Sequence, residues 1–524
     1  ILDAILTMNS GAAEPGYRKA YTFWADTGNN LLKMRNSAND GWIDLRTLTG
    51  GLTSSADASI NSVAVGKGAN SVAGNTVLGE TALDASVSGG NNTAIGKNAL
   101  TALTSGTSNT AVGGSALEAN TTQSQNTAVG FEALLSNTQD NNVAVGWQAG
   151  KLNTTGIITA IGRRALLNNT TGNYNTGVGY QAASTHTTGD NITAIGYNAL
   201  QQNTTASNNT AVGYNSLTAN TTGAFNVAVG ALALDANTTA NFNTAIVESA
   251  LTDNTTGANN TGVGYNALGD NTTGTQNVAI GALTLDANTT SSNNTAVGHA
   301  TLSDNTGESN TAIGRAALNA NTTASNNTAV GKDALLVNTT GTQNTAVGSR
   351  ALDANTTANN NTAIGDVCLS ANTTGAGNTA IGQSALFANT TADNNTAVGK
   401  SALSANTTGT NLVAVGKDAL KNNTTASRNT AIGHNSQDAT TTGGLNTSVG
   451  DESMSANTTG ENNTAVGVFA LDANTTASAN TALGYNALSE NTTGVQNLAV
   501  GAFALDANTT AGDNTGLVYA TLST

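Results

Sequence analysis

Apolar residues return at fixed places in a 17-residue unit that fills most of this chain. The unit reads N-T-A-[VI]-G-x-x-A-L-x-A-N-T-T-x-x-x, and it recurs from about Asn91 to the last residue. With its first Asn counted as position 1, position 4 is aliphatic, position 9 is usually Leu, and positions 3, 8 and 11 are usually Ala. So short a period predicts one small supersecondary unit per repeat, stacked into a parallel β-solenoid, or β-roll.

Positions 2 to 4 predict a strand, in which successive side chains point to opposite faces. Because position 4 is always aliphatic, we expect positions 2 and 4 to face the solenoid interior. Leu at position 9 and Ala at position 11, from a second run, would complete that interior. The predicted core residues are Ile95, Val112, Leu100, Leu117, Ile364, Leu369, Ile381 and Leu386.

Position 3 stays small throughout, with Gly177, Gly262, Gly516 and Ser448 as its exceptions to Ala. A small residue that faces away from its own core is expected to pack against another copy of the chain. This predicts a homo-oligomer, with a trimer favoured. The alternative is that a loop of the same turn covers the alanine. The predicted packing residues are Ala94, Ala111, Ala128, Ala211, Ala346, Ala363, Ala380 and Ala397.

Three further regularities concern the bend of the unit, the stacking of its turns and its duplication. Gly at position 5 indicates a backbone that needs positive φ, so Val247, which replaces it, should mark a distorted turn. Asn at position 12 and Thr at positions 13 and 14 should form side-chain ladders between turns about 4.8 Å apart. Position 15 alternates between Ala and Gly, which indicates that the chain grew from a duplicated 34-residue unit.

The chain is predicted to have three parts. Residues 1–50 form a β-rich attachment module, in which a hairpin of 21–26 and 31–35 is followed by a third strand at 41–45. Trp24 and Trp42 are expected to form its core, and a binding platform is the alternative. Residues 51–90 are a transition with shorter units of 13–14 residues, and residues 91–524 form the shaft.

The transition carries a specific resemblance. Residues 61–74 (NSVAVGKGANSVAG) resemble the head repeat of trimeric autotransporter adhesins, which implies a left-handed parallel β-roll in a three-chain bundle. The longer unit, as in 344–360 (NTAVGSRALDANTTANN), resembles the tandem repeats of phage tail-fibre and tail-spike-like proteins. The segment around Trp24 and Trp42 is similar to short modules upstream of such repeats.

Composition excludes several classes of function. Charged residues make up 9% of the chain, the net charge is −15 and the cations are scattered, so no nucleic-acid partner is expected. No apolar run is long enough to span a membrane. The single cysteine, Cys368, takes the Ala slot at position 8 and should be a packed residue.

The repeat gives little indication of a catalytic site, because catalysis needs different side chains that converge and a repeat offers rows of identical ones. His186, His299 and His434 lie many turns apart, and the calcium-binding G-G-x-G-x-D spacing is missing, so no metal or cofactor is expected. The Asn-Thr-Thr glycosylation sequons recur so closely that glycans would collide, and only sparse occupancy is expected.

These patterns predict a non-enzymatic, extracellular or virion-surface fibre. The leading hypothesis is a phage tail-fibre shaft used in host attachment, joined head to tail or to a virion through residues 1–50; its host receptor is not indicated. The apolar run Ile1–Leu6 is expected to dock into a neighbouring subunit. The alternatives are a bacterial surface adhesin or extracellular filament, and an ice-binding solenoid. Adjacent threonines at positions 13 and 14 point oppositely and disfavour ice binding, which needs Thr residues that share a face.

Overall fold

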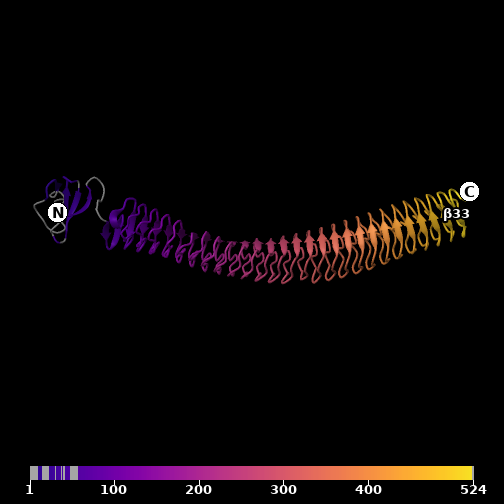
Figure 1. Ribbon diagram of the computed structural model, residues 1–524, viewed down its shortest axis with the longest axis horizontal. Helices are drawn as coiled ribbons and strands as arrows, with labels where there is room; N and C mark the ends of the chain where they lie inside the picture. The colour runs from indigo at the N-terminus through magenta and orange to yellow at the C-terminus, as the bar shows by residue number, and fades with distance from the viewer. Residues whose placement is uncertain are drawn as a thin grey trace, which may run out of the picture. The chain divides into compact units, whose positions relative to one another are not determined.

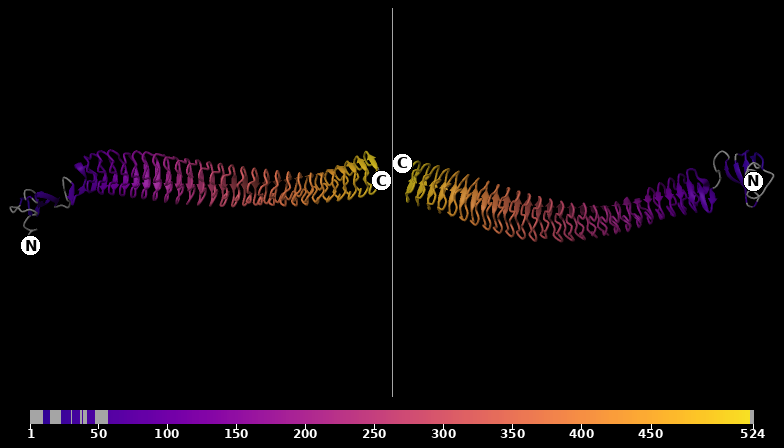
Figure 2. Two further views of the ribbon diagram at one scale, coloured as in Figure 1. Left: turned by 90° about the horizontal axis from the view of Figure 1, so that it is seen from below. Right: turned by 180° about the vertical axis from the view of Figure 1, so that it is seen from behind.

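The computed structural model describes residues 10–14, 23–29, 31–36, 38, 42–47 and 57–521. The chain divides into two compact units, residues 1–208 and 209–524. Both consist mainly of stacked turns of a parallel β-solenoid, which Figures 1 and 2 show from three sides. The predicted docking segment Ile1–Leu6 lies outside the described residues.

The first unit begins with a small sheet in the order β1-β2-β3-β4. Strands β2 and β3 form the predicted antiparallel hairpin, β4 pairs antiparallel with β3, and β1 adds a parallel strand that the sequence did not predict. Trp24 is buried and Trp42 is partly buried, and their ring centroids lie 5.4 Å apart, so the two tryptophans pack together as expected for a core. The strands are β1 (Ser10–Gly11), β2 (Phe23–Asp26), β3 (Leu31–Arg35) and β4 (Trp42–Thr47).

The solenoid of the first unit starts with a reversal of the chain. Strand β5 pairs antiparallel with β6, and β6 antiparallel with β7, so this hairpin covers the first parallel strand edge. From β7 onward every pairing in this unit is parallel. The elements are β5 (Ala58–Ile60), β6 (Val63–Gly66), the 3₁₀ turn η1 (Ala69–Ser71), β7 (Thr76–Gly79), β8 (Thr93–Ile95), β9 (Thr110–Val112), β10 (Thr127–Val129), β11 (Val143–Val145), β12 (Ile158–Ile161), β13 (Asn175–Val178) and β14 (Thr193–Ile195).

The second unit repeats one turn without interruption. Each strand pairs in register with the next, so that Thr362 faces Thr379, Ala363 faces Ala380 and Ile364 faces Ile381. The strands are β15 (Thr210–Val212), β16 (Val227–Val229), β17 (Thr244–Ile246), β18 (Thr261–Val263), β19 (Val278–Ile280), β20 (Thr295–Val297), β21 (Thr311–Ile313), β22 (Thr328–Val330), β23 (Thr345–Val347), β24 (Thr362–Ile364), β25 (Thr379–Ile381), β26 (Thr396–Val398), β27 (Val413–Val415), β28 (Thr430–Ile432), β29 (Thr447–Val449), β30 (Thr464–Val466), β31 (Thr481–Leu483), β32 (Leu498–Val500) and β33 (Thr515–Leu517).

In most turns only positions 2 to 4 form a strand, and β12 and β13 also include position 1; the expected second run is a series of tight turns instead. In the turn 361–377, Gly365 has φ 140°, and Val367 and Leu369 have φ 49° and 54°. A β-carbon on Gly365 would lie 2.6 Å from the carbonyl oxygen of Gly382 in the next turn, so stacking adds a second reason for glycine. Val247 at this position has φ 89°, which confirms the predicted local distortion.

The interior of each turn is narrow and is lined by positions 1, 3, 8, 9 and 12. In the turn 361–377 these are Asn361, Ala363, Cys368, Leu369 and Asn372, and none of them is exposed. Leu at position 9 supplies most of the apolar volume. Two asparagines per turn lie in the same interior, which the sequence did not predict.

Candidate interaction surfaces

The strand faces are the reverse of the prediction. Ala at position 3 points into the solenoid of its own chain, where its exposure is zero, so the predicted packing of these alanines against another copy is wrong. The residues concerned are Ala94, Ala111, Ala128, Ala211, Ala346, Ala363, Ala380 and Ala397.

Space explains why position 3 stays small. At Gly262, an added β-carbon would lie 3.3 Å from Cγ of Leu251, the position-9 leucine of the preceding turn. At Gly516 the matching distance to Cγ of Leu505 is 2.8 Å. The leucine therefore fills the interior up to the strand and leaves room for one methyl group at most.

The predicted core residues separate into two groups. Leu100, Leu117, Leu369 and Leu386 are fully buried, which confirms position 9 as core. The position-4 residues lie on the outer face of the sheet, so their assignment to the core was wrong. Ile364 is 39% exposed and Ile381 is 38% exposed, and Ile95 and Val112 are partly exposed.

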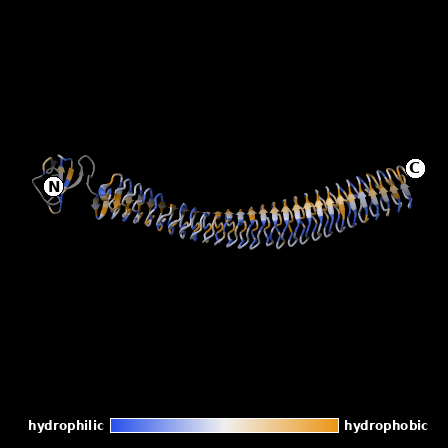
Figure 3. Cartoon of the chain, viewed as in Figure 1, coloured by the Kyte–Doolittle hydropathy of each residue, from blue (hydrophilic) through white to orange (hydrophobic). Residues whose placement is uncertain are grey.

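The outer face combines two in-register rows of side chains. From β20 to β26 every strand reads Thr-Ala-[Val/Ile], so a row of Thr at position 2 runs beside a row of Val or Ile at position 4. The recurring apolar strand segments of the second unit are visible in Figure 3. We call these two rows the outer strand face.

Two ladders of buried asparagines run through the interior. At position 12, Asn372 donates to Asn355 Oδ1 at 3.1 Å and to the Gly375 carbonyl at 2.9 Å, and it accepts from Asn389 at 2.9 Å. At position 1, Asn361 Oδ1 accepts the backbone N–H of Asn378 at 2.9 Å. Each amide thus joins one turn to the next, and the predicted Asn ladder is confirmed.

The ladder at position 12 also corrects the expectation for glycosylation. From Asn120 to Asn491 the asparagines of the Asn-Thr-Thr sequons have no exposed area, and their Nδ2 groups donate hydrogen bonds inside the turn, as at Asn355 and Asn372. A glycan on such a nitrogen would displace the interior. Even sparse occupancy of these sequons is therefore incompatible with the folded turns.

His186 replaces one asparagine of the position-12 ladder and is fully buried. Its Nε2 lies 2.8 Å from the Gly189 carbonyl, and its Nδ1 lies 2.7 Å from Nδ2 of Asn203. A neutral ring with its proton on Nε2 satisfies both contacts. Burial lowers the pKa of His186 below its ordinary value of 6.5.

We therefore expect acid to destabilise the turns around His186. Between the folded and the unfolded pKa the unfolded chain binds more protons, so the free energy of unfolding should fall as the pH drops below about 6.5. The variant His186→Asn restores the ladder residue and should lose this part of the pH dependence. Urea unfolding at pH 7.5 and pH 5 would measure the free energy of unfolding of each protein. An equal loss of stability between the two pH values in both proteins would contradict the assignment.

A row of large side chains follows the first-unit strands at position 6, directly after the strand glycine. Arg163 lies between two rings, its Cζ 4.9 Å from the ring centroid of Trp147 and 5.4 Å from that of Tyr180. Tyr180 stacks on Tyr197 with 5.1 Å between centroids and 8° between planes. Phe131 begins the row and is 48% exposed. The sequence prediction missed this row, although the recurrence of aromatic residues at one repeat position in consecutive turns could have revealed it.

Two ionisable side chains that the sequence analysis singled out, Cys368 and His434, both have partners. Burial raises the pKa of the Cys368 thiol to about 12, and its Sγ donates to the Ala380 carbonyl at 3.1 Å, so the cysteine is packed as predicted. His434 is exposed at position 6 and lies 3.0 Å from Asp451. Within the described part of the chain, no three His, Cys, Asp or Glu side chains are grouped so that they could hold a metal ion.

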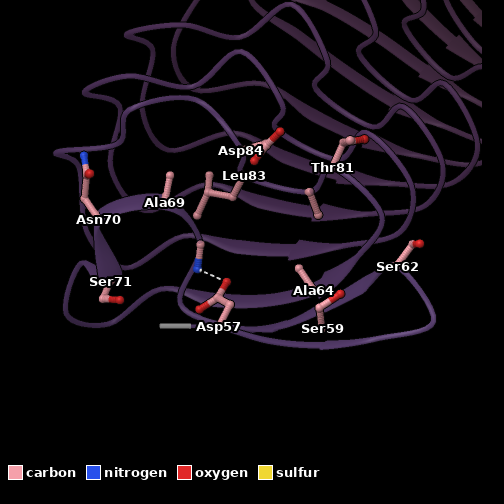
Figure 4. A pocket seen from close by; sticks show the side chains of 12 residues that line it. Asp57, Ser59, Ser62, Ala64, Ala69, Asn70, Ser71, Thr81, Leu83 and Asp84 are labelled. Carbon is pink, nitrogen blue, oxygen red and sulfur yellow. Dashed lines mark hydrogen bonds between the residues drawn. The ribbon is translucent and has the colours of Figure 1, made fainter. Parts of the chain in front are cut away.

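A polar hollow lies at the start of the solenoid, between the β5–β6 hairpin and the turn of Leu83 (Figure 4). Its most distinctive group, the Asp57 carboxylate, accepts the backbone N–H of Lys67 at 2.6 Å and of Gly68 at 2.7 Å. Asp57 therefore closes the hairpin and is already satisfied by backbone.

Across the described ranges, no helix has the length and hydropathy needed to cross a bilayer. The chain matches no protein-family model, and a comparison with curated proteins gives no significant match.

Proposed function

We propose that this chain forms the shaft of a non-enzymatic, extracellular fibre, in which parallel copies associate through the outer strand face. One observation carries the proposal: a row of aliphatic side chains at position 4 lies on the outside of every turn of the second unit, and several are more than a third exposed. Long contiguous apolar rows on a soluble protein typically mark interaction surfaces.

A second copy is the partner that fits this row best. The row presents an aliphatic side chain at every turn, so a partner must present a matching apolar surface over the same number of turns. Another solenoid of the same sequence does so. In an assembly with closed cyclic symmetry, every chain buries this face against its neighbours and no such face remains exposed. We propose three copies, because the repeat resembles those of trimeric fibres.

The setting that fits such a shaft is a phage tail fibre used in host attachment, with residues 1–50 as the joining module. A bacterial surface filament would use the same assembly. Electron microscopy of the native particle separates the two, because a tail fibre must be attached to a virion.

The assembly is tested by three substitutions on consecutive turns, Val347→Lys, Ile364→Lys and Ile381→Lys. Analytical ultracentrifugation should show three chains for the unmodified protein and one for the variant, because lysines facing lysines across the interface repel and are costly to desolvate. Circular dichroism should remain unchanged, since these side chains do not enter the interior.

The matched control places lysines at the exposed position 14 of the same turns, in Thr357→Lys, Thr374→Lys and Thr391→Lys. This control should remain a trimer. An unmodified protein that sediments as a single chain would overturn the proposal. Ice binding would then gain support, since the Thr and Val/Ile rows of β20–β26 would face water in register, and an ice-growth assay would test it.

A further inference from the structure

The position-6 row of the first unit differs from the rest of that unit's surface. Phe131, Trp147, Arg163, Tyr180 and Tyr197 occupy this position in five consecutive turns. Phe131 is 48% exposed and Tyr197 46% exposed, and Arg163 is also exposed. We call these five residues the aromatic–arginine row.

The stacking of the row decides which atoms a ligand would meet. The centroids of Tyr180 and Tyr197 are 5.1 Å apart and their planes are nearly parallel, which matches the separation of about 4.8 Å between adjacent strands. The two rings therefore lie across the stacking direction and cover each other's faces. Tyr197 is 46% exposed, and the edge of an aromatic ring is its electropositive part.

Arg163 adds a cation that is held in place. Its guanidinium lies between the rings of Trp147 and Tyr180, and Nη1 is 3.5 Å from the Tyr180 hydroxyl. Among the described residues, no carboxylate forms an ion pair with it. Arg164 is a second cation, 4.9 Å from the Trp147 centroid, with its Nε donating to Gln148.

The acidic residue beside this row is already neutralised. Glu132 follows Phe131 directly in the chain, accepts from Gln148 at 2.8 Å and pairs with Lys151 at 2.5 Å. These contacts lower the pKa of Glu132, with the Lys151 hydrogen bond as the largest cause. The aromatic–arginine row is therefore a locally electropositive strip on a chain with a net charge of −15.

We propose that the aromatic–arginine row binds an acidic polysaccharide that lies along the stacked turns. Arg163 and Arg164 receive carboxylate or sulfate groups, for which guanidinium geometry is well suited. The tyrosines on the other side of Arg163 bind sugar hydroxyls beside these charges. The preordered stack lowers the conformational entropy lost on binding.

The density of charge favours a polysaccharide over a nucleic acid. Duplex DNA carries a charge about every 1.7 Å of its axis and is bound through many cations. The row offers two guanidinium groups, both 4.9 Å from the Trp147 ring centroid, which suits a polymer whose few acidic groups are flanked by neutral, hydroxyl-rich segments. The biological meaning of the site, as a contact with a host surface, rests on the proposed fibre function; the binding itself does not.

The test is isothermal titration calorimetry of the full chain with polygalacturonate of defined length. Neutral dextran, polyglutamate and a DNA oligonucleotide are the comparison ligands. We expect binding of polygalacturonate alone, weakened by added salt. Arg163→Gln should weaken it about tenfold, the typical effect of losing one hydrogen bond to a charged group. Tyr197→Ala should weaken it as well.

The matched control is Arg350→Gln, which removes an exposed arginine from a turn of the second unit and should leave the affinity unchanged. Equal weakening by Arg350→Gln would show unspecific charge attraction and overturn the proposal. Equal binding of dextran, polyglutamate or DNA, or no binding of polygalacturonate, would also overturn it. Sedimentation of the same samples reports the oligomeric state separately, so failure of the fibre proposal is recognised independently.

Discussion

Lysine at position 380 is expected to unfold the turns around it, whereas lysine at the neighbouring position 381 leaves them folded. Ala380 has no exposed area and lies in an interior that the position-9 leucines fill, so Ala380→Lys introduces an unpaired charge and excess volume. An uncompensated buried charge costs on the order of 3–5 kcal/mol. Ile381 is 38% exposed on the outer strand face, so its replacement leaves the interior intact.

Native-state hydrogen exchange is the measurement for this pair, because each turn of a solenoid contacts only its neighbours and damage should remain local. The amides of β24, β25 and β26 should lose protection in Ala380→Lys and keep it in Ile381→Lys. The opposite result would mean that Ala380 faces outward and would restore the packing of alanines between copies.

Removal of one amide from the interior ladder is expected to cost about 2 to 4 kcal/mol. The variant Asn372→Ala deprives Asn355 Oδ1 and the Gly375 carbonyl of a donor, and deprives the Asn389 amide of an acceptor. The Gly375 carbonyl keeps the Asn361 amide as a donor and the Asn389 amide keeps the Ala392 carbonyl, so only Asn355 Oδ1 loses its one donor. A buried polar group without a partner costs about 1–3 kcal/mol, and the other lost hydrogen bonds add about 1 kcal/mol. Urea unfolding followed by circular dichroism would measure the loss.

The control for this prediction is Thr374→Ala, two residues further in the same turn. Thr374 is exposed at position 14, so the free energy of unfolding should change by less than about 0.5 kcal/mol. Equal effects of the two substitutions would show that the ladder contributes nothing beyond its backbone contacts.

Both predictions depend on which residues of a turn face the interior, and the repeat pattern could not show this. The pattern was sufficient to predict the parallel solenoid and its period, the strand at positions 2 to 4 and the bend at the position-5 glycine. It also predicted the burial of Leu369 and its equivalents. It was also sufficient for the β2–β3 hairpin, whose turn signal is local. These features follow from side-chain alternation and backbone preferences within a few residues.

The candidate interaction surfaces could be identified only from the tertiary structure. Alternation divides a strand into two faces but does not say which is interior. The aliphatic residue at position 4 suggested one answer, yet the leucine at position 9, which the turn folds against the strand, leaves space only for the methyl group of Ala380 and its equivalents. The pattern predicted a ladder at Asn372 and its equivalents but not its burial, which is possible because the stacking of identical turns supplies the hydrogen-bond partners.

The sequence by itself therefore determined that the chain stacks identical turns, because a strict repeat imposes the same local structure on every copy. Only the tertiary structure decided that Ala380 and Asn372 are inside and Ile381 is outside, because that depends on how the two sides of one turn share a narrow interior.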